Sequence, residues 1–300
     1  MKNKALKRLI CGLSIILASI PFFSFALSSS QKDTITGSGY KIKTIIVDAG
    51  HGVRPSGVSG NYSPGASGSY SLERDVTLAL ALKLQKEIEK QLTGVKVVLT
   101  RSTDEDIAWQ KRADIANENK GDLFISLHCN SLPSRRVHEV VGHKHNKPVY
   151  RTVEVPDRSG KGVLLLVYGF HRTKEEEKAI KENLVEADSD MNTSLDPSDP
   201  ESMILMNTYM RKYRKQSIHL AELLNTEFVD TDGRHSDGIR EQGVLVLCHS
   251  AMPAVLVETG YINNPDDEAY LNSEDGQNEI VASIVRALMN YKTEVEQVSP

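Results

Sequence analysis

The sequence predicts an α/β protein, a single domain in which a mostly parallel, roughly six-stranded sheet is flanked by helices and carries long insertions. Short β-branched runs alternate with helical patterns from Lys41 onward, which is typical of βαβ units around a buried parallel sheet. The 300 residues show no repeat period and no Pro/Ser-rich linker. One domain over residues 40–292 is therefore the simplest arrangement.

Six short apolar runs are the candidate strands, at residues 44–48, 95–100, 123–127, 162–167, 244–247 and 254–257. They are rich in Val, Ile and Leu and do not alternate with polar residues. Strands that are buried on both faces have this composition.

Four segments carry apolar residues at helical spacing. The first begins near Glu73 and ends before Gly94, and the second covers residues 106–119. A third stripe runs over residues 206–224, and a C-terminal one over 280–288. We expect all four stripes to face the core, and residues 293–300 to form a tail.

The first 26 residues have the pattern of an export signal. Four cations and no acid precede the apolar run 9–20, and Ser24-Phe25-Ala26 provides a small-x-small cleavage site. Pro21 keeps the run below the ~20 residues that a stable membrane span needs, so we expect cleavage rather than anchoring. Residues 27–39 are polar and Ser-rich and are expected to form a flexible leader.

Composition and charge disfavour a collagen-like, a disordered or a multi-span membrane protein, and also a nucleic-acid-binding protein. The chain has 39% hydrophobic and 25% charged residues, as globular proteins do. Its net charge is −4, and removing the four signal cations leaves 32 basic against 40 acidic residues, or −8, which disfavours nucleic-acid binding. Only Cys129 and Cys248 remain after the signal, too few for a disulfide scaffold. We expect buried thiols, and a disulfide between them is the alternative if their strands are neighbours.

Three connections are longer than usual for a βα unit. Residues 53–70 are rich in Gly and Ser, residues 132–161 form a basic insertion, and residues 173–202 are acidic and begin with a helical pattern. Long insertions in compact domains are usually functional. The basic insertion either meets an anionic polymer or keeps its loop in solvent.

Polar side chains gather where three predicted strands end, and parallel α/β sheets place their reactive groups at that edge. His51, His128 and Glu258 follow three such strands, and Glu73 opens a helix. Two imidazoles and one carboxylate can bind a catalytic zinc ion and leave a position for water. Glu258 would then be free to act as base. Each residue alone also fits a structural role, such as a hydrogen-bonded strand-end histidine.

Four motifs together resemble the zinc-dependent N-acetylmuramoyl-L-alanine amidases of the AmiC type, amidase family 3. They are Asp48-Ala49-Gly50-His51-Gly52, Leu72-Glu73-Arg74-Asp75-Val76, Ser126-Leu127-His128-Cys129-Asn130-Ser131 and the run from Leu256 to Pro265. Shorter matches occur at residues 100–104 and 112–117, and the likeness covers about Lys41 to Tyr291. The resemblance implies Zn²⁺ ligands at His51, Glu73 and His128 and a catalytic glutamate at Glu258.

The resemblance also implies a substrate, peptidoglycan, cut at the amide between N-acetylmuramic acid and L-alanine. Two alternatives stay open: a catalytically silent peptidoglycan-binding module, and a secreted zinc peptidase that cuts within the stem peptide. Asp48 and Asn130 flank two of the ligands. They either orient the imidazoles or act as ordinary hydrogen bonders at strand ends.

Some AmiC-type relatives hold an inhibitory helix over the zinc. Residues 181–188 look similar to that element, with Glu182 as the candidate plug and Glu186 as the second choice; the alternative is a solvated acidic helix. Without a separate wall-binding domain, targeting would come from the insertions or from a protein activator. The export signal indicates a secreted protein, and the periplasm is the preferred address.

Overall fold

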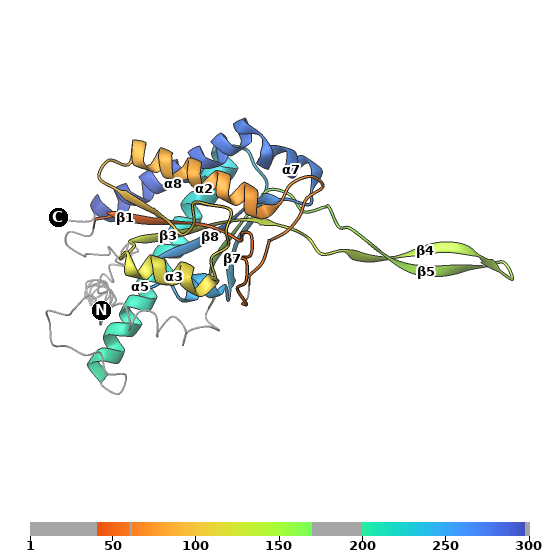
Figure 1. The fold of residues 1–300 in the computed structure, drawn as a ribbon, viewed down its shortest axis with the longest axis horizontal. Coiled ribbons are helices and arrows are strands. Elements are labelled where there is room, and N and C mark those ends of the chain that lie inside the picture. Colours follow the sequence, from red (N-terminus) through yellow and green to blue (C-terminus); the bar gives the residue numbers. More distant parts are fainter. Residues whose placement is uncertain (1–40, 61, 170–199, 298–300) are drawn as a thin grey trace, which may run out of the picture. The chain divides into compact units, whose positions relative to one another are not determined.

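The centre of the fold is a six-stranded sheet with the strand order β2-β1-β3-β8-β6-β7 (Figure 1). The strands are β1 Thr44–Ala49, β2 Lys96–Leu99, β3 Leu123–Asn130, β6 Val163–Tyr168, β7 Ser236–Gln242 and β8 Ala254–Tyr261. All neighbours pair in parallel except β6 and β8, which are antiparallel. The predicted α/β class with a mostly parallel six-stranded sheet is therefore confirmed.

The computed structural model describes residues 41–60, 62–169 and 200–297. All of these belong to one compact unit, residues 37–300. The expected signal peptide (1–26), the expected leader (27–39) and residues 173–199 of the acidic insertion lie outside the described residues. No helix in the described part of the chain is long and apolar enough to cross a membrane.

Helices cover both faces of the sheet, and the strand residues divide between two apolar layers. The helices are α2 Glu73–Gln91, α3 Trp109–Glu118, α5 Pro200–Thr226, the π-helix η3 Glu227–Thr231, α6 Leu245–Cys248, α7 Pro265–Asn272 and α8 Glu274–Gln297. Ile45 and Val47 pack with α2, α5 and α8, whereas Ile46 packs with α3 and α6 on the opposite face. Consecutive strand residues point to opposite faces, which explains the continuous apolar runs.

One predicted strand is wrong. Residues 244–247 belong largely to the short helix α6, and the sixth strand is β7, at residues 236–242. A short apolar run cannot be assigned to strand or helix from periodicity alone. The run at α6 is apolar because Val246, Leu247 and Cys248 are buried against the sheet. Strand β7 is at the sheet edge and half-exposed, so its polar sequence SDGIREQ gives no strand signal.

The basic insertion is not a loop but a long hairpin of two antiparallel strands, β4 Arg135–Lys144 and β5 Lys147–Val155. In Figure 1 this ribbon extends away from the six-stranded sheet. Its turn residues His145 and Asn146 have φ values of 52° and 59°. A two-residue turn with positive φ at both positions matches the right-handed twist of the strands, so it joins them tightly.

Two element ends differ from expectation. Helix α8 continues to Gln297, so residues 293–297 are helical rather than part of a tail. Helix α5 begins at Pro200, which places the last three residues of the expected acidic insertion inside a helix.

The two cysteines are buried thiols, as expected. Cys129 packs on the face covered by α2 and α8, and Cys248 packs on the opposite face. The sheet therefore lies between them, and they are not joined to each other.

Candidate metal centre

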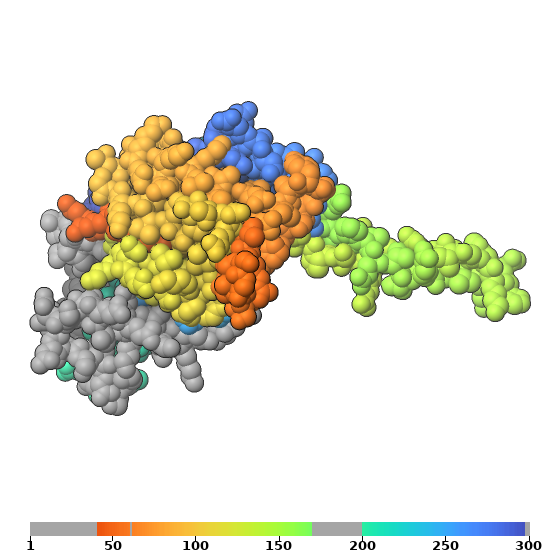
Figure 2. Space-filling view, viewed as in Figure 1, coloured from red at the N-terminus to blue at the C-terminus, as the bar shows by residue number. Residues whose placement is uncertain are grey.

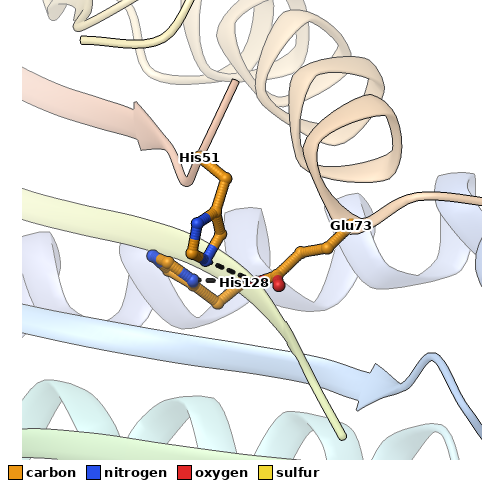
Figure 3. Close-up of side chains that lie close together, drawn as sticks. All are labelled: His51, Glu73 and His128. Atoms are coloured by element: carbon orange, nitrogen blue, oxygen red, sulfur yellow. Dashed lines mark hydrogen bonds and ion pairs between the residues drawn. The ribbon is translucent and has the colours of Figure 1, made fainter. Parts of the chain in front are cut away.

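Three elements bring His51, Glu73 and His128 together at the carboxyl ends of the inner strands β1 and β3 (Figure 3). His51 follows β1 by two residues, Glu73 is the first residue of α2, and His128 lies within β3. The ligand atoms of the three side chains lie within 4.8 Å of one another. The predicted convergence of these residues is thus present in the structure.

The distances within this group suit a small cation. Glu73 Oε1 lies 3.3 Å from His51 Nε2 and 2.9 Å from His128 Nδ1. The two imidazole rings meet edge to face, with centroids 4.8 Å apart and an interplanar angle of 81°. Zinc ligands at about 2.0–2.1 Å from the ion in a tetrahedron are separated by roughly 3.3 Å, which is close to the spacing seen here.

Burial and hydrogen bonding fix the carboxylate of Glu73. The side chain is only 4% exposed, and its oxygens accept hydrogen bonds from the backbone N–H of Ala66 and of Cys129. Burial alone would raise the pKa of Glu73, but contacts with the imidazoles of His128 and His51 lower that pKa instead. Glu73 is therefore an anion held in a single position.

Two glycines leave the room that the imidazoles occupy. A Cβ atom at Gly50 would lie 2.5 Å from the ring of His128. At Gly65, where φ is +77°, a Cβ atom would lie 2.5 Å from Glu73 Oε2 and 2.9 Å from the ring of His51. Such distances are shorter than van der Waals contact, so the close approach of backbone to side chain requires glycine at both positions.

Glu258 lies next to this group. It pairs with His128 in the register of β8 against β3, and paired residues of adjacent strands point to the same face. Its Oε2 atom is buried and has no hydrogen-bond partner among the described residues. Burial raises the pKa of Glu258 to about 7, with the charge of Glu73 acting in the same direction and His128 opposing it. The carboxyl group can therefore take up and release a proton near neutral pH.

Asp48 is engaged by the protein scaffold rather than by an imidazole. Its carboxylate accepts hydrogen bonds of 2.6 Å from Thr100, from Ser126 and from Arg112. Burial alone would raise the pKa of Asp48, but Arg112 and the two hydroxyls lower it. Of the two roles considered for Asp48, these contacts favour the strand-end hydrogen bonder.

Arg112 carries the connection from Asp48 to the metal centre. Its guanidinium also donates to the carbonyl oxygen of His51 at 2.8 Å and to Asp106 Oδ1 at 2.6 Å. Asp106 in turn accepts from the backbone N–H of Ser63, whose carbonyl oxygen lies 3.2 Å from His51 Nδ1. His51, with its positive φ of 60°, is thereby held through its backbone and through its ring.

Arg101 holds the same turn from another side. Its guanidinium donates to the carbonyl oxygens of Ala49, Gly50 and Arg74, and so links the end of β1 to the first turn of α2. Both arginines lie inside the short motif matches at residues 100–104 and 112–117, which predict no role for them. Their positions next to a strand end and in a helix did not indicate which carbonyl groups they would reach.

The remaining predicted residues are Asn130, Glu182 and Glu186. Asn130 is the last residue of β3, and its side chain accepts from the backbone N–H of Ser131, as a strand-end hydrogen bonder does. Glu182 and Glu186 lie outside the described residues, so the inhibitory plug stays a prediction.

Fold and site together define a class, an enzyme built on an open α/β sheet. Its two imidazoles and one carboxylate at the carboxyl ends of the strands are suited to a divalent metal. The neighbouring carboxyl group is suited to proton transfer. The particular family follows from sequence comparison. The N-acetylmuramoyl-L-alanine amidase family model, Amidase_3, matches residues 45–290, so the chain belongs to this family and is a hydrolase of that type.

Curated relatives support this assignment at low identity. A protein of Buchnera aphidicola is 28% identical over 248 residues, which cover 82% of this chain and 95% of that protein. The N-acetylmuramoyl-L-alanine amidase AmiC of Escherichia coli is 27% identical over 254 residues, which cover 82% of this chain and 52% of AmiC. The chain therefore spans about half the length of AmiC but nearly all of the Buchnera protein.

Solved structures share the fold. The N-acetylmuramyl-L-alanine amidase Ami1 of Mycobacterium smegmatis superposes with a TM-score of 0.54 at 17% identity, covering 84% of this chain and 99% of Ami1. An N-acetylmuramoyl-L-alanine amidase of Clostridium difficile 630 gives 0.51 at 21% identity, covering 84% and 97%. The sheet with its flanking helices is thus the fold of these structures.

Proposed function

We propose that this protein hydrolyses the amide between the lactyl group of N-acetylmuramic acid and the L-alanine of the peptidoglycan stem peptide. The reaction would use a zinc ion held by His51, Glu73 and His128, with Glu258 as general base. The observation that supports the proposal is the pairing of Glu258 with His128 in adjacent strands, because a carboxyl group beside the cluster of His51, Glu73 and His128 would suit a general base.

The donor set fits zinc. Two imidazole nitrogens and one carboxylate oxygen form a common catalytic zinc site, which leaves a fourth position for water or substrate. When bound, zinc lowers the pKa of water toward neutrality and polarises the scissile carbonyl. Among the described residues, Glu73 accepts hydrogen bonds from the backbone N–H groups of Ala66 and Cys129. The His51 ring contacts the carbonyl oxygen of Ser63, and the His128 ring contacts Glu73 Oε1.

Glu258 would move the proton. Its pKa of about 7 lets the carboxylate take a proton from the attacking water and return it to the amine of L-alanine as that amine leaves. The partnerless Oε2 atom gives this carboxyl group a position that no hydrogen bond of the described residues restrains. A module that only binds peptidoglycan would not need such a group beside the ligands.

The finer assignments rest on sequence alone. An AmiC-type protein that is exported to the periplasm agrees with the signal pattern of residues 1–26 and with peptidoglycan as the substrate. A protein activator is compatible with the insertions.

Product analysis tests the proposal. The purified protein is incubated with purified peptidoglycan, and the released products are identified by mass spectrometry. We expect intact stem peptides with free L-alanine amino ends. Shortened stem peptides would instead identify a peptidase that cuts within the stem, and no release would leave a binding module.

Glu258→Ala tests the base in the same assay. We expect this variant to keep its zinc, measured by metal analysis, and to lose about 10²–10⁴-fold in rate. The matched control is Glu89→Gln, which changes an exposed carboxylate on α2 and should leave the rate unchanged. Full activity of Glu258→Ala would contradict the assignment of the base.

A further inference from the structure

The end of the β4–β5 hairpin is an exposed apolar and cationic surface that the amidase site does not use. We call residues 140–150 the hairpin tip. Every residue in this range is exposed, including Val140 at 52%, Val141 at 51%, Val149 at 41% and Tyr150 at 59%. Figure 2 shows the hairpin, in green, standing clear of the residues around the sheet on the face in view.

The strand register distributes the exposed apolar side chains over both faces of the hairpin tip. Val140 pairs directly with Tyr150, and the register shift at Val141 leaves an additional valine beside this pair. Val149 pairs with Gly142 and, as the neighbour of Tyr150 in β5, points to the opposite face. Exposed valines are common singly, but three valines and a tyrosine around the end of a two-stranded ribbon favour contact with an apolar partner.

Charge divides the hairpin into a stem and a tip. In the stem, Arg136 pairs with Glu154 at 3.2 Å and Arg151 with Glu139 at 3.6 Å, so these cations have partners within the hairpin. The tip contains Lys144 and Lys147 and no acidic residue. The two lysines are opposite each other in the register, and neither forms an ion pair with a residue that the structure describes. Like charges in direct opposition are unfavourable unless an anion lies nearby.

We propose that the hairpin tip binds the surface of a lipid bilayer that carries anionic headgroups. Such a surface offers phosphate groups to Lys144 and Lys147 and, a few ångströms deeper, an apolar boundary to the valines and to the ring of Tyr150. The hairpin would lie at the interface and not span the bilayer. Its two strands have open edges, and unpaired backbone groups cannot enter hydrocarbon.

Two other occupants fit less well. A hydrophilic polyanion would neutralise the lysines but would leave the four apolar side chains in water. A second copy of the chain at the same surface would place four lysines together, because the tip has no acid to offer a partner. Binding of the hairpin tip to a bilayer is separate from the proposed reaction. A binding measurement therefore tests it without an assay of amidase activity.

The test is co-sedimentation of the purified protein, with the hairpin in place in the complete folded chain, with two kinds of lipid vesicle. One kind contains phosphatidylglycerol and phosphatidylcholine in equal parts, and the other contains phosphatidylcholine alone. We expect binding to the anionic vesicles that weakens with added salt. Lys144→Gln/Lys147→Gln should lower the partition coefficient about 25-fold, since each lysine near an anionic surface contributes roughly a fivefold gain.

An apolar variant and a control complete the design. Val140→Thr/Tyr150→Thr keeps residues that favour strands but removes the directly paired valine and tyrosine, two of the four exposed apolar side chains of the tip, and it should also bind about tenfold more weakly. The control is Lys86→Gln/Lys90→Gln, which removes the same charge from an exposed face of α2 and should bind like the natural chain. Both hairpin variants should release peptidoglycan products at the natural rate, because the tip is not part of the metal centre.

Each remaining outcome overturns the proposal. Equal binding to neutral and anionic vesicles would show that anionic headgroups are not recognised. Equal loss in the α2 control would show that the tip is not the lipid-binding element. Loss of binding on lysine replacement with full binding of Val140→Thr/Tyr150→Thr would show that charge alone carries the binding, and would exclude an apolar contact with the bilayer. No binding of the natural chain to either vesicle would leave a protein as the partner of this surface.

Discussion

Arg112 and Asp48 form a buried ion pair next to the backbone of His51 at the candidate metal centre. Arg112 Nη1 lies 2.6 Å from Asp48 Oδ1, and the two side chains are 5% and 1% exposed. The same guanidinium binds Asp106 and the carbonyl oxygen of His51. Because His51 has a positive φ that an L-residue rarely adopts, its backbone needs such support.

Replacing Arg112 by alanine should lower the free energy of unfolding by about 3–5 kcal/mol, because two buried carboxylates would lose their common partner. Urea denaturation of the metal-free protein measures this change. The control is Arg136→Ala, which breaks an exposed pair with Glu154 and should cost less than about 1 kcal/mol. Similar costs for the two variants would show that the buried pair is not a structural support.

The ion pair also has a consequence for acid stability. Since the pKa of Asp48 is lowered in the folded protein, its carboxylate contributes stability above the ordinary value of 3.8 and loses that contribution as the pH falls through the folded value. The natural protein should therefore lose stability steeply below about pH 4, and Asp48→Asn should show a shallower acid slope. A slope that is identical in the two proteins would contradict the assignment.

The central residues of the site could be predicted from sequence because the side chains that can bind a metal lie at the ends of recognisable strands. His51, His128 and Glu258 each occur in or just after an apolar run, and parallel strands bring their carboxyl ends to one edge. Strand β3 continues through His128 to Asn130, and β8 continues through Glu258, so these residues lie within strands rather than after them. Their convergence did not depend on that boundary.

The rest could not be predicted because it depends on partners distant in sequence. Arg112 is an unremarkable residue in a helical pattern until the fold places Asp48 and the carbonyl of His51 within its reach. Strand β7 is polar because it is an edge strand, and the β4–β5 hairpin has no buried face that would create alternation. Where a strand does not pack on the core, its residues need not be apolar, and the sequence then carries little of the hydrophobic pattern that predicts a strand.

The burial of Glu258 predicts a pH-dependent stability. A raised pKa means that Glu258 binds its proton more tightly in the folded protein than in the unfolded chain. The contribution of this proton to stability is therefore complete below about pH 4.5 and is lost as the pH rises through about 7. In the metal-free protein, Glu258→Gln should therefore raise the melting temperature at pH 8, by an amount equivalent to at most about 3 kcal/mol. The difference should nearly vanish at pH 5.

Thermal melts of both proteins at the two pH values measure this effect. Adding zinc should reduce the advantage of Glu258→Gln, because a nearby cation favours the carboxylate form of Glu258. If the variant is no more stable than the natural protein at pH 8, the carboxyl group is not desolvated in the way described.

Removal of a ligand should abolish metal-dependent stability. We expect a chelator to lower the melting temperature of the natural protein, and added zinc to restore it, because the ion binds the folded state. His128→Ala should show neither response, since two ligands remain of three. His138→Ala removes an exposed imidazole on the hairpin and serves as the control. A normal zinc response in His128→Ala would place the metal elsewhere.

Gly50 offers a test of the geometry that leaves every ligand in place. A Cβ atom there would lie 2.5 Å from the ring of His128, whereas at Gly142 in the hairpin a Cβ atom would meet nothing within 4 Å. Gly50→Ala should therefore displace the imidazole, weaken zinc binding by at least tenfold and reduce amidase activity, and Gly142→Ala should change neither. Zinc titration and product release measured on both variants decide the matter. Because no donor atom is removed, a loss confined to Gly50→Ala would indicate that the position of the His128 ring matters for zinc binding. Unchanged zinc affinity would mean that this ring does not bind the metal where the structure places it.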